Sequence, residues 1–185
     1  GSEMDGTRAD KAELIAHLLR HERLKGEQLV VVGDRKHDVA GAHAHGARSI
    51  REAILSGANT IEHASLIDAT AIELARQHAV ALSMDVYNGD YIDKEGREQG
   101  WPEEFLRKNL ETVEAQRQGF TQAHAAGVPI VYGTDAAVYP HGLNARQFRI
   151  MVQRGMTPME AIQSATSVAA RYMGWEDRVG AIAPG

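Results

Sequence analysis

Apolar runs and amphipathic segments alternate along the chain. Four short apolar runs are typical of buried parallel strands: 28–33, 59–63, 80–86 and 129–133. Five segments with apolar residues at helical spacing lie around them: 11–24, 68–77, 102–126, 144–154 and 157–172. The polar, glycine-rich stretch 88–100 is expected to be a mobile loop. This order predicts an α/β fold of about four parallel strands with helices on both faces, in three layers as in flavodoxin-like or Rossmann-like proteins.

The segment 38–46 (DVAGAHAHG) allows two interpretations, strand or helix. As a strand it would follow the strand 28–33 after only about five residues, whereas a crossover between parallel strands needs a dozen or more. A helix that continues through 47–55 would place several apolar residues on one face. The helix is therefore favoured, although each of its glycines costs ~1 kcal/mol.

Composition excludes several classes of protein. The chain has 185 residues, of which 43% are hydrophobic, enough for one domain with a core. Twenty Lys and Arg against 25 Asp and Glu give a net charge of −5, so no nucleic-acid partner is expected. The absence of cysteine excludes disulfides, thiolate metal sites and a cysteine nucleophile. No apolar run reaches the roughly 20 residues of a membrane span and no signal peptide opens the chain, so a cytoplasmic protein without membrane contact is expected.

Four segments from residue 43 onward carry motifs that occur together in one enzyme family. In chain order they read HAHGARSIREAILSGANTIEHASLID, SMDVYNGDY, AAGVPIVYGTDAAVYPHG and RGMTPMEAIQSATSVAARYMGWEDRVGAIAPG. Together they resemble the metal-dependent amidohydrolases, specifically the imidazolonepropionase- and Xaa-Pro-dipeptidase-like branch. The resemblance covers residues 43–185 and implies the second half of a (β/α)8 barrel.

This resemblance implies roles for four residues. In the family, a histidine after the fifth strand, a histidine after the sixth and an aspartate after the eighth help to hold one or two divalent metals. The matching residues are His43, His63 and Asp135, which would form a zinc-type site with Asp135 as the catalytic base. His141 lies on a loop that contacts substrate in the family. In the helix favoured for 38–46, His43 would instead lie on a helix face, and exposure alone would also explain His141.

The segment before residue 43 resembles a different family. The sequence DGTRADKAELIAHLLRHERLKGEQLVVVGDRKHDVAGAHAHG is similar to the C-terminal part of haloacid-dehalogenase-like phosphatases, close to the phosphoglycolate phosphatases. The resemblance implies that Lys11 neutralises a phosphoryl group and that Asp34 and Asp38 bind Mg²⁺. Alternatively, Lys11 is a solvated helix residue, Asp34 ends a strand, and Asp38 stabilises the first turn of a helix.

The two resemblances overlap at 40–46, as a crossover point would. We therefore expect an engineered chimera that forms a single α/β domain over 1–185. Its segment 1–42 would derive from the phosphatase and 43–185 from the amidohydrolase half-barrel. Because a half-barrel exposes edge strands that favour pairing with another chain, a homodimer formed through these strands is also expected.

Three hypotheses about function follow. The family's His-x-His pair and bridging lysine belong to the first half-barrel, and the phosphatase nucleophile has no counterpart here. The leading hypothesis is therefore a recombined scaffold that is not an enzyme and needs no cofactor. The alternative is a residual zinc-dependent hydrolase of amide or ester bonds, in which His43, His63 and Asp135 hold the metal. The third is a vestigial Mg²⁺-dependent phosphatase that uses Asp34 and Asp38.

Overall fold

The computed structural model describes residues 31–32 and 41–182. The expected helix at 11–24 and the candidate residues Lys11, Asp34 and Asp38 lie outside these described residues. The division of the chain at residue 42 therefore stays a prediction. Within the described ranges, no helix combines the length and the apolar character that a membrane crossing requires.

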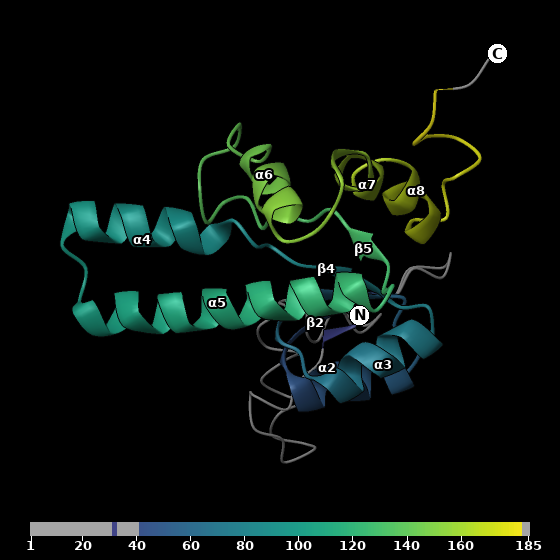
Figure 1. Ribbon diagram of the computed structural model, residues 1–185, viewed down its shortest axis with the longest axis horizontal. Coiled ribbons are helices and arrows are strands. Elements are labelled where there is room, and N and C mark those ends of the chain that lie inside the picture. The colour runs from purple at the N-terminus through teal and green to yellow at the C-terminus, as the bar shows by residue number, and fades with distance from the viewer. Residues whose placement is uncertain (1–30, 33–40, 183–185) are drawn as a thin grey trace, which may run out of the picture.

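One five-stranded sheet organises the described part of the chain (Figure 1). Its strands are β1 (Val31–Val32), β2 (Gly41–Gly46), β3 (Thr60–Leu66), β4 (Ala81–Ser83) and β5 (Ile130–Val131). They lie side by side in chain order. Strands β2 to β5 are parallel to one another, whereas β1 is antiparallel to β2. Four parallel strands are thus confirmed, three of them where they were expected, at 59–63, 80–86 and 129–133.

The helix prediction for 38–46 is wrong, because residues 41–46 form the strand β2. A strand at 38–46 is incompatible with the short connection before it only if the preceding strand runs parallel to it. In the structure Val31 pairs with His43 in an antiparallel ladder, which a short connection can close. The parallel orientation expected for the strand at 28–33 is wrong for the same reason. Helix α2 (Ala47–Leu55) instead makes the long crossover, from β2 to β3.

The strand order does not support the flavodoxin-like, three-layer arrangement. Sheets of that type reverse their strand order at a switch point. Here β2, β3, β4 and β5 follow one another without reversal. Because crossovers between parallel strands are right-handed, successive steps in one direction place their helices on the same face of the sheet. This is the arrangement of a partial (β/α)8 barrel.

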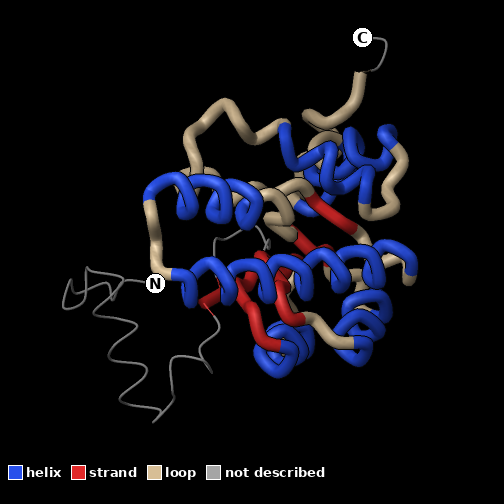
Figure 2. Tube along the Cα trace, turned by 60° about the vertical axis from the view of Figure 1, so that its left-hand side comes forward, coloured by secondary structure: helices blue, strands red, loops and turns tan. Residues whose placement is uncertain are grey.

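Six more helices follow in the described part of the chain (Figure 2). They are α3 (Ala69–Gln77), α4 (Asn88–Gln99), α5 (Glu103–Ala125), α6 (Arg146–Gln153), α7 (Pro158–Ser164) and α8 (Ser167–Tyr172). The start of α3 is fixed by Asp68, whose side chain accepts a hydrogen bond from the Ala71 amide. The helices expected at 68–77, 102–126 and 144–154 are confirmed, and the last expected helix is divided into α7 and α8.

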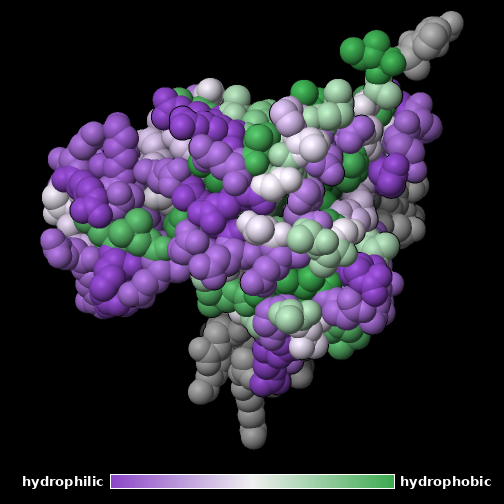
Figure 3. All heavy atoms as spheres, in the orientation of Figure 1, coloured by the Kyte–Doolittle hydropathy of each residue, from purple (hydrophilic) through white to green (hydrophobic). Residues whose placement is uncertain are grey.

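The mobile loop expected at 88–100 is instead helix α4, which packs against α5 in a hairpin that projects beyond the sheet (Figure 1). Two glycines allow the close contact. A Cβ atom at Gly89 would lie 1.7 Å from Val113 Cγ2, and one at Gly96 would lie 2.6 Å from Leu106 Cδ2. The hairpin is mainly hydrophilic on the face seen in Figure 3, and ion pairs at i, i+4 spacing support α4. The loop prediction for 88–100 is therefore wrong, because its polar residues and glycines are compatible with a solvent-exposed helix that packs closely against α5.

Alternation along the central strands separates an apolar core from a polar face. Ala42, Ile61 and Leu82 are fully buried and belong to one cluster with apolar side chains of α2, α3 and α5. Residues at the positions between them line two cavities on the other face: Gly41, His43, Thr60, Glu62 and Ser83. The core thus fixes the strands, while the opposite face of the sheet presents polar side chains to the two cavities.

We predict that Gly89→Ala lowers the free energy of unfolding by about 1–3 kcal/mol, because the added methyl group overlaps Val113. Urea unfolding measures the change. The control is Gly46→Ala, since Gly46 has φ −81° and a Cβ there would meet only Ser49 Oγ, at 3.6 Å. Equal stability of the two variants would contradict the tight contact between α4 and α5.

Candidate metal centre

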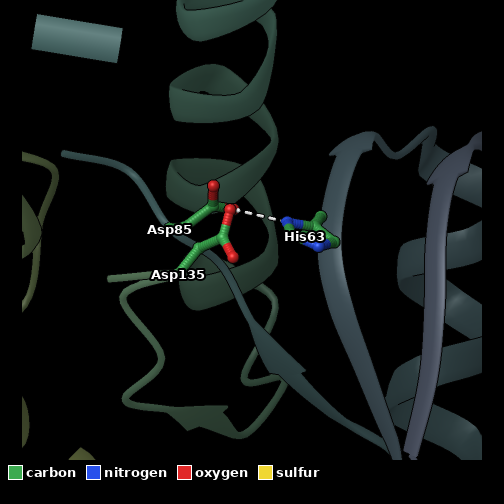
Figure 4. A group of neighbouring side chains, drawn as sticks. All are labelled: His63, Asp85 and Asp135. Atoms are coloured by element: carbon green, nitrogen blue, oxygen red, sulfur yellow. Dashed lines mark hydrogen bonds and ion pairs between the residues drawn. The ribbon is translucent and has the colours of Figure 1, made fainter. Parts of the chain in front are cut away.

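The ends of four parallel strands bring histidines and carboxylates together. His43 lies on β2 and His63 on β3, while Asp85 and Asp135 follow β4 and β5. Carboxyl ends of parallel strands meet at one edge of a sheet, and side chains there converge. All four residues line a cavity of about 120 Å³, together with Glu62, Ser83, Gly133 and Thr134. Figure 4 shows Asp85 and Asp135 pointing toward the His63 ring.

His63 contacts a different partner with each ring nitrogen. Its Nδ1 lies 3.1 Å from Asp85 Oδ1, and its Nε2 lies 3.3 Å from His43 Nδ1. The hydrogen bond with Asp85 raises the pKa of His63, and this effect outweighs burial, which acts in the opposite direction. The ring is therefore held between an anionic acceptor and a second imidazole.

The two imidazoles suit a shared cation. Nitrogens bound to one tetrahedral zinc at 2.0–2.1 Å are separated by roughly 3.4 Å, and the observed separation of His43 Nδ1 from His63 Nε2 is 3.3 Å. A group of His63, Asp85 and Asp135 also brings its ligand atoms within 4.8 Å of one another. Nitrogen and carboxylate oxygen are the donors that zinc prefers when no thiolate is present. The residues therefore fit a zinc-type ion.

The carboxylate of Asp85 is almost enclosed, and only 13% of the side chain is exposed. Gln116 donates to Oδ1 at 2.8 Å, and Asn88 donates to Oδ2 at 2.6 Å. Burial alone would raise the pKa of Asp85, but the hydrogen bonds from His63 and Gln116 outweigh it, so the pKa lies below its ordinary value. Asp85 is thus a buried anion with its charge compensated.

Asp135 has the opposite environment. The residue is exposed, and Asn88 donates to its Oδ2 over a longer distance, 3.3 Å. Its backbone has φ 48°, in the left-handed region that residues other than glycine rarely adopt. Such strain is found where a side chain must be directed into a site. Asp135 therefore offers a carboxylate that is available for a metal or a proton.

The backbone of His63 is also left-handed, with φ 70°, and Ala64 follows with φ 47°. Each such residue costs about 1–3 kcal/mol. Gln116 compensates locally, because its amide nitrogen donates to the His63 carbonyl at 3.1 Å as well as to Asp85. The buried Gln116 side chain thereby holds both the left-handed backbone at His63 in β3 and the carboxylate of Asp85 after β4.

His45 lies next to the site and outside the cavity. Its ring stacks on that of His63 with the centroids 4.5 Å apart, and its Nδ1 forms a 2.9 Å hydrogen bond with Ser65. Burial, together with the neighbouring His63, lowers the pKa of His45. The neutral ring therefore packs against His63 and restricts its movement.

The structure thus brings together three of the predicted site residues, namely His43, His63 and Asp135. His141 is exposed and does not line the cavity, so nothing here places it at the site. The sequence pattern did not identify Asp85 and Gln116. Asp85 could have been found, because it lies near the end of the expected strand 80–86, much as Asp135 lies just after the expected strand 129–133.

Residues 31–185 match the family model described as the amidohydrolase family. The chain belongs to the amidohydrolase family. The match extends from the first described strand through the metal centre and all the helices given above. The predicted resemblance to amidohydrolases is therefore confirmed, and it includes residues 31–42, which had been assigned to another family.

Individual proteins are also similar to this chain. Ochratoxinase from Aspergillus niger is 32% identical over 152 residues, which are 80% of this chain and 31% of the relative. A crystal structure of a Xaa-Pro dipeptidase with bound methionine has 34% identity and a TM-score of 0.72, over 78% of this chain and 36% of that one. The chain thus spans about a third of the length of the proteins it matches.

A shorter similarity links 50 residues, 27% of the chain, to a 5′-nucleotidase from Pseudomonas aeruginosa at 52% identity. It covers 23% of that relative and does not establish a second family. Neither the chimera nor the phosphatase origin of 1–42 is shown. The inert scaffold expected as the leading function is also less well supported than the hydrolase, because family, fold and strand-end residues agree on the latter.

We predict that Gln116→Glu lowers the free energy of unfolding by about 1–3 kcal/mol at neutral pH, because a second carboxylate would face Asp85. The folded pKa of Asp85 is lowered, so its contribution to stability is present above the ordinary pKa and is lost as the pH falls through the folded value. In the variant, the two carboxylates raise each other's pKa. The difference from the wild type should therefore shrink toward about pH 4, where one carboxyl is protonated.

Urea unfolding at several pH values measures this difference. Gln122→Glu is the matched control, since Gln122 is an exposed residue of the same helix. A loss of stability independent of pH, or an equal loss in the control, would contradict the placement of Gln116 beside Asp85.

Proposed function

We propose that this chain carries the metal ligands and the catalytic base of a zinc-dependent hydrolase that cleaves amide or ester bonds. The observation that carries the proposal is the separation of His43 Nδ1 and His63 Nε2 by 3.3 Å, in one cavity with the exposed carboxylate of Asp135. Membership of the amidohydrolase family supports it. His43, His63 and Asp135 would hold the ion.

Each protein group has a task in this reaction. When bound, zinc supplies Lewis acidity, which makes water a nucleophile near neutral pH and polarises a carbonyl group. His43 and His63 would hold the ion through ring nitrogens. The Asp135 carboxylate would accept the proton of the attacking water and return it to the leaving nitrogen or oxygen. Because Asp135 is exposed and its hydrogen bond from Asn88 is long, 3.3 Å, it can exchange a proton without breaking a short hydrogen bond.

Dipeptide-like amides are the substrates that the comparisons favour. One structural relative is a Xaa-Pro dipeptidase, and one relative by sequence is an ochratoxinase. Glu62, Ser83 and Thr134 add polar groups to the cavity wall, and these could orient the carbonyl group of such a substrate. The Mg²⁺-dependent phosphatase stays a prediction, and no observation favours it over the hydrolase. The homodimer also stays a prediction.

We predict that chelator-treated protein binds about one zinc ion per chain and that His63→Gln abolishes this binding. Isothermal titration and elemental analysis after desalting measure it. His78→Gln is the control, because His78 is an exposed residue at the end of α3. A wild-type protein that retains no zinc, or a His63 variant that retains all of it, would contradict the proposed centre.

We predict further that Asp135→Asn lowers the rate of hydrolysis of Xaa-Pro dipeptides and of simple esters by about 10²–10⁴-fold, since the general base is lost. Asp177→Asn, an exposed residue after the last helix, should keep the wild-type rate. Equal rates for the Asp135 variant and the wild type would refute the assigned base, even if zinc is bound.

A further inference from the structure

We propose that Asp85 is a positioning residue that fixes the tautomer and orientation of His63, and that Asn88 and Gln116 hold Asp85 in that task. The inference rests on the proposed function, because it assigns a role toward the same metal. It adds residues that the resemblance did not supply. The role is to keep the proton of the neutral ring on Nδ1, so that the lone pair of Nε2 faces His43.

The tautomer follows from the contacts. A carboxylate accepts hydrogen bonds and donates none, so Nδ1 of His63 must carry the proton that lies between it and Asp85 Oδ1. The neutral ring has only one N–H group, and Nε2 is therefore unprotonated. This is the nitrogen that lies 3.3 Å from His43 Nδ1, on the side of the shared cavity. A histidine that binds zinc through one nitrogen commonly donates the other N–H to a carboxylate in this way.

Asp85 is engaged on both oxygens, which distinguishes it from a metal ligand. Oδ1 accepts from His63 and Gln116, and Oδ2 accepts from Asn88 at 2.6 Å. Moving the carboxylate onto a metal would break these short hydrogen bonds at a place where little water can replace them. Among the described residues, only Asn88 donates to the Asp135 carboxylate, over 3.3 Å, and Asp135 is exposed, so it can bind the ion without this loss.

Two helices set the position of Asp85. Gln116 lies in the middle of α5 and is buried, with only 5% of its surface exposed. Asn88 is the first residue of α4 and is 7% exposed. Its amide nitrogen reaches both Asp85 and Asp135, so it also fixes the spacing of the two carboxylates. The hairpin of α4 and α5 therefore positions His63 through Asp85.

Asp85→Ala and Asp85→Asn test the proposal with two measurements. The first is zinc affinity by competition with a chelator, which we expect to fall about 10–100-fold in both variants. The second is ¹⁵N NMR of the metal-free histidine rings at about pH 9, where the imidazole is neutral. We expect Nδ1–H for His63 in the wild type, a mixture of tautomers in Asp85→Ala, and mainly Nδ1–H in Asp85→Asn, whose Oδ1 still accepts. Asp93→Asn on α4 is the control for both, because its carboxylate pairs with Arg97 and does not line the cavity.

Three results would overturn the assignment. One is a zinc affinity in both variants within about twofold of the wild type. Another is the same tautomer in Asp85→Ala as in the wild type. The third is a changed visible spectrum of bound Co²⁺ in Asp85→Asn, since altered coordination would make Asp85 a ligand rather than a positioning residue. If Asp85→Ala does not fold, Asp85→Asn carries the affinity and Co²⁺ measurements, and wild-type His63 without Nδ1–H also rejects the proposal.

The proposed function can fail independently of this one. A wild-type protein that binds no zinc would reject the metal centre, whereas the tautomer of His63 in the metal-free protein would still decide whether Asp85 orients the ring.

Discussion

A carboxylate that is mostly withdrawn from water must find compensation inside the protein, and the arrangement around Asp85 meets this requirement. Removing an anion from water costs several kcal/mol unless hydrogen bonds replace the lost hydration. Here the replacement comes from three separate elements, through His63 of β3, Gln116 of α5 and Asn88 of α4. Satisfying one charge therefore fixes two strand ends and a helical hairpin relative to one another.

The same requirement explains why the two aspartates of the site differ. Asp85 and Asp135 both follow parallel strands and both line the cavity, yet one is enclosed and the other exposed. Environment alone assigns a positioning role to the first and leaves the second free to bind a metal and exchange a proton. Asn88 donates a hydrogen bond to both carboxylates, so a single side chain sets the distance between Asp85 and Asp135.

Much of this structure could be predicted from local patterns. The strands and helices from residue 59 onward, except α4, follow from apolar periodicity and helix caps, whereas the family resemblance identified His63 and Asp135. The segment 38–46 could not be assigned locally, because its conformation depends on an antiparallel partner, a property of the whole sheet. Helix α4 was missed because its glycines allow close packing against Val113 and Leu106 of α5 and do not make the segment flexible.

The positioning residues were the hardest to predict. Gln116 is a polar residue within a long helix, where nothing in the sequence separates a buried amide from a solvated one. Gln116 donates a hydrogen bond to the carbonyl of His63, whose backbone is left-handed. No sequence pattern predicts that backbone conformation. Catalytic side chains at strand ends are therefore easier to predict than the groups that hold them.

We propose that one cation binds between His43, His63 and Asp135. Anomalous X-ray scattering at the zinc absorption edge, on crystals of the full chain loaded with zinc, would locate it. We expect one strong peak within bonding distance of His43 Nδ1, His63 Nε2 and an Asp135 oxygen, with Asp85 still hydrogen-bonded to His63. A peak only at exposed histidines elsewhere, or coordination through Asp85 in place of Asp135, would contradict it.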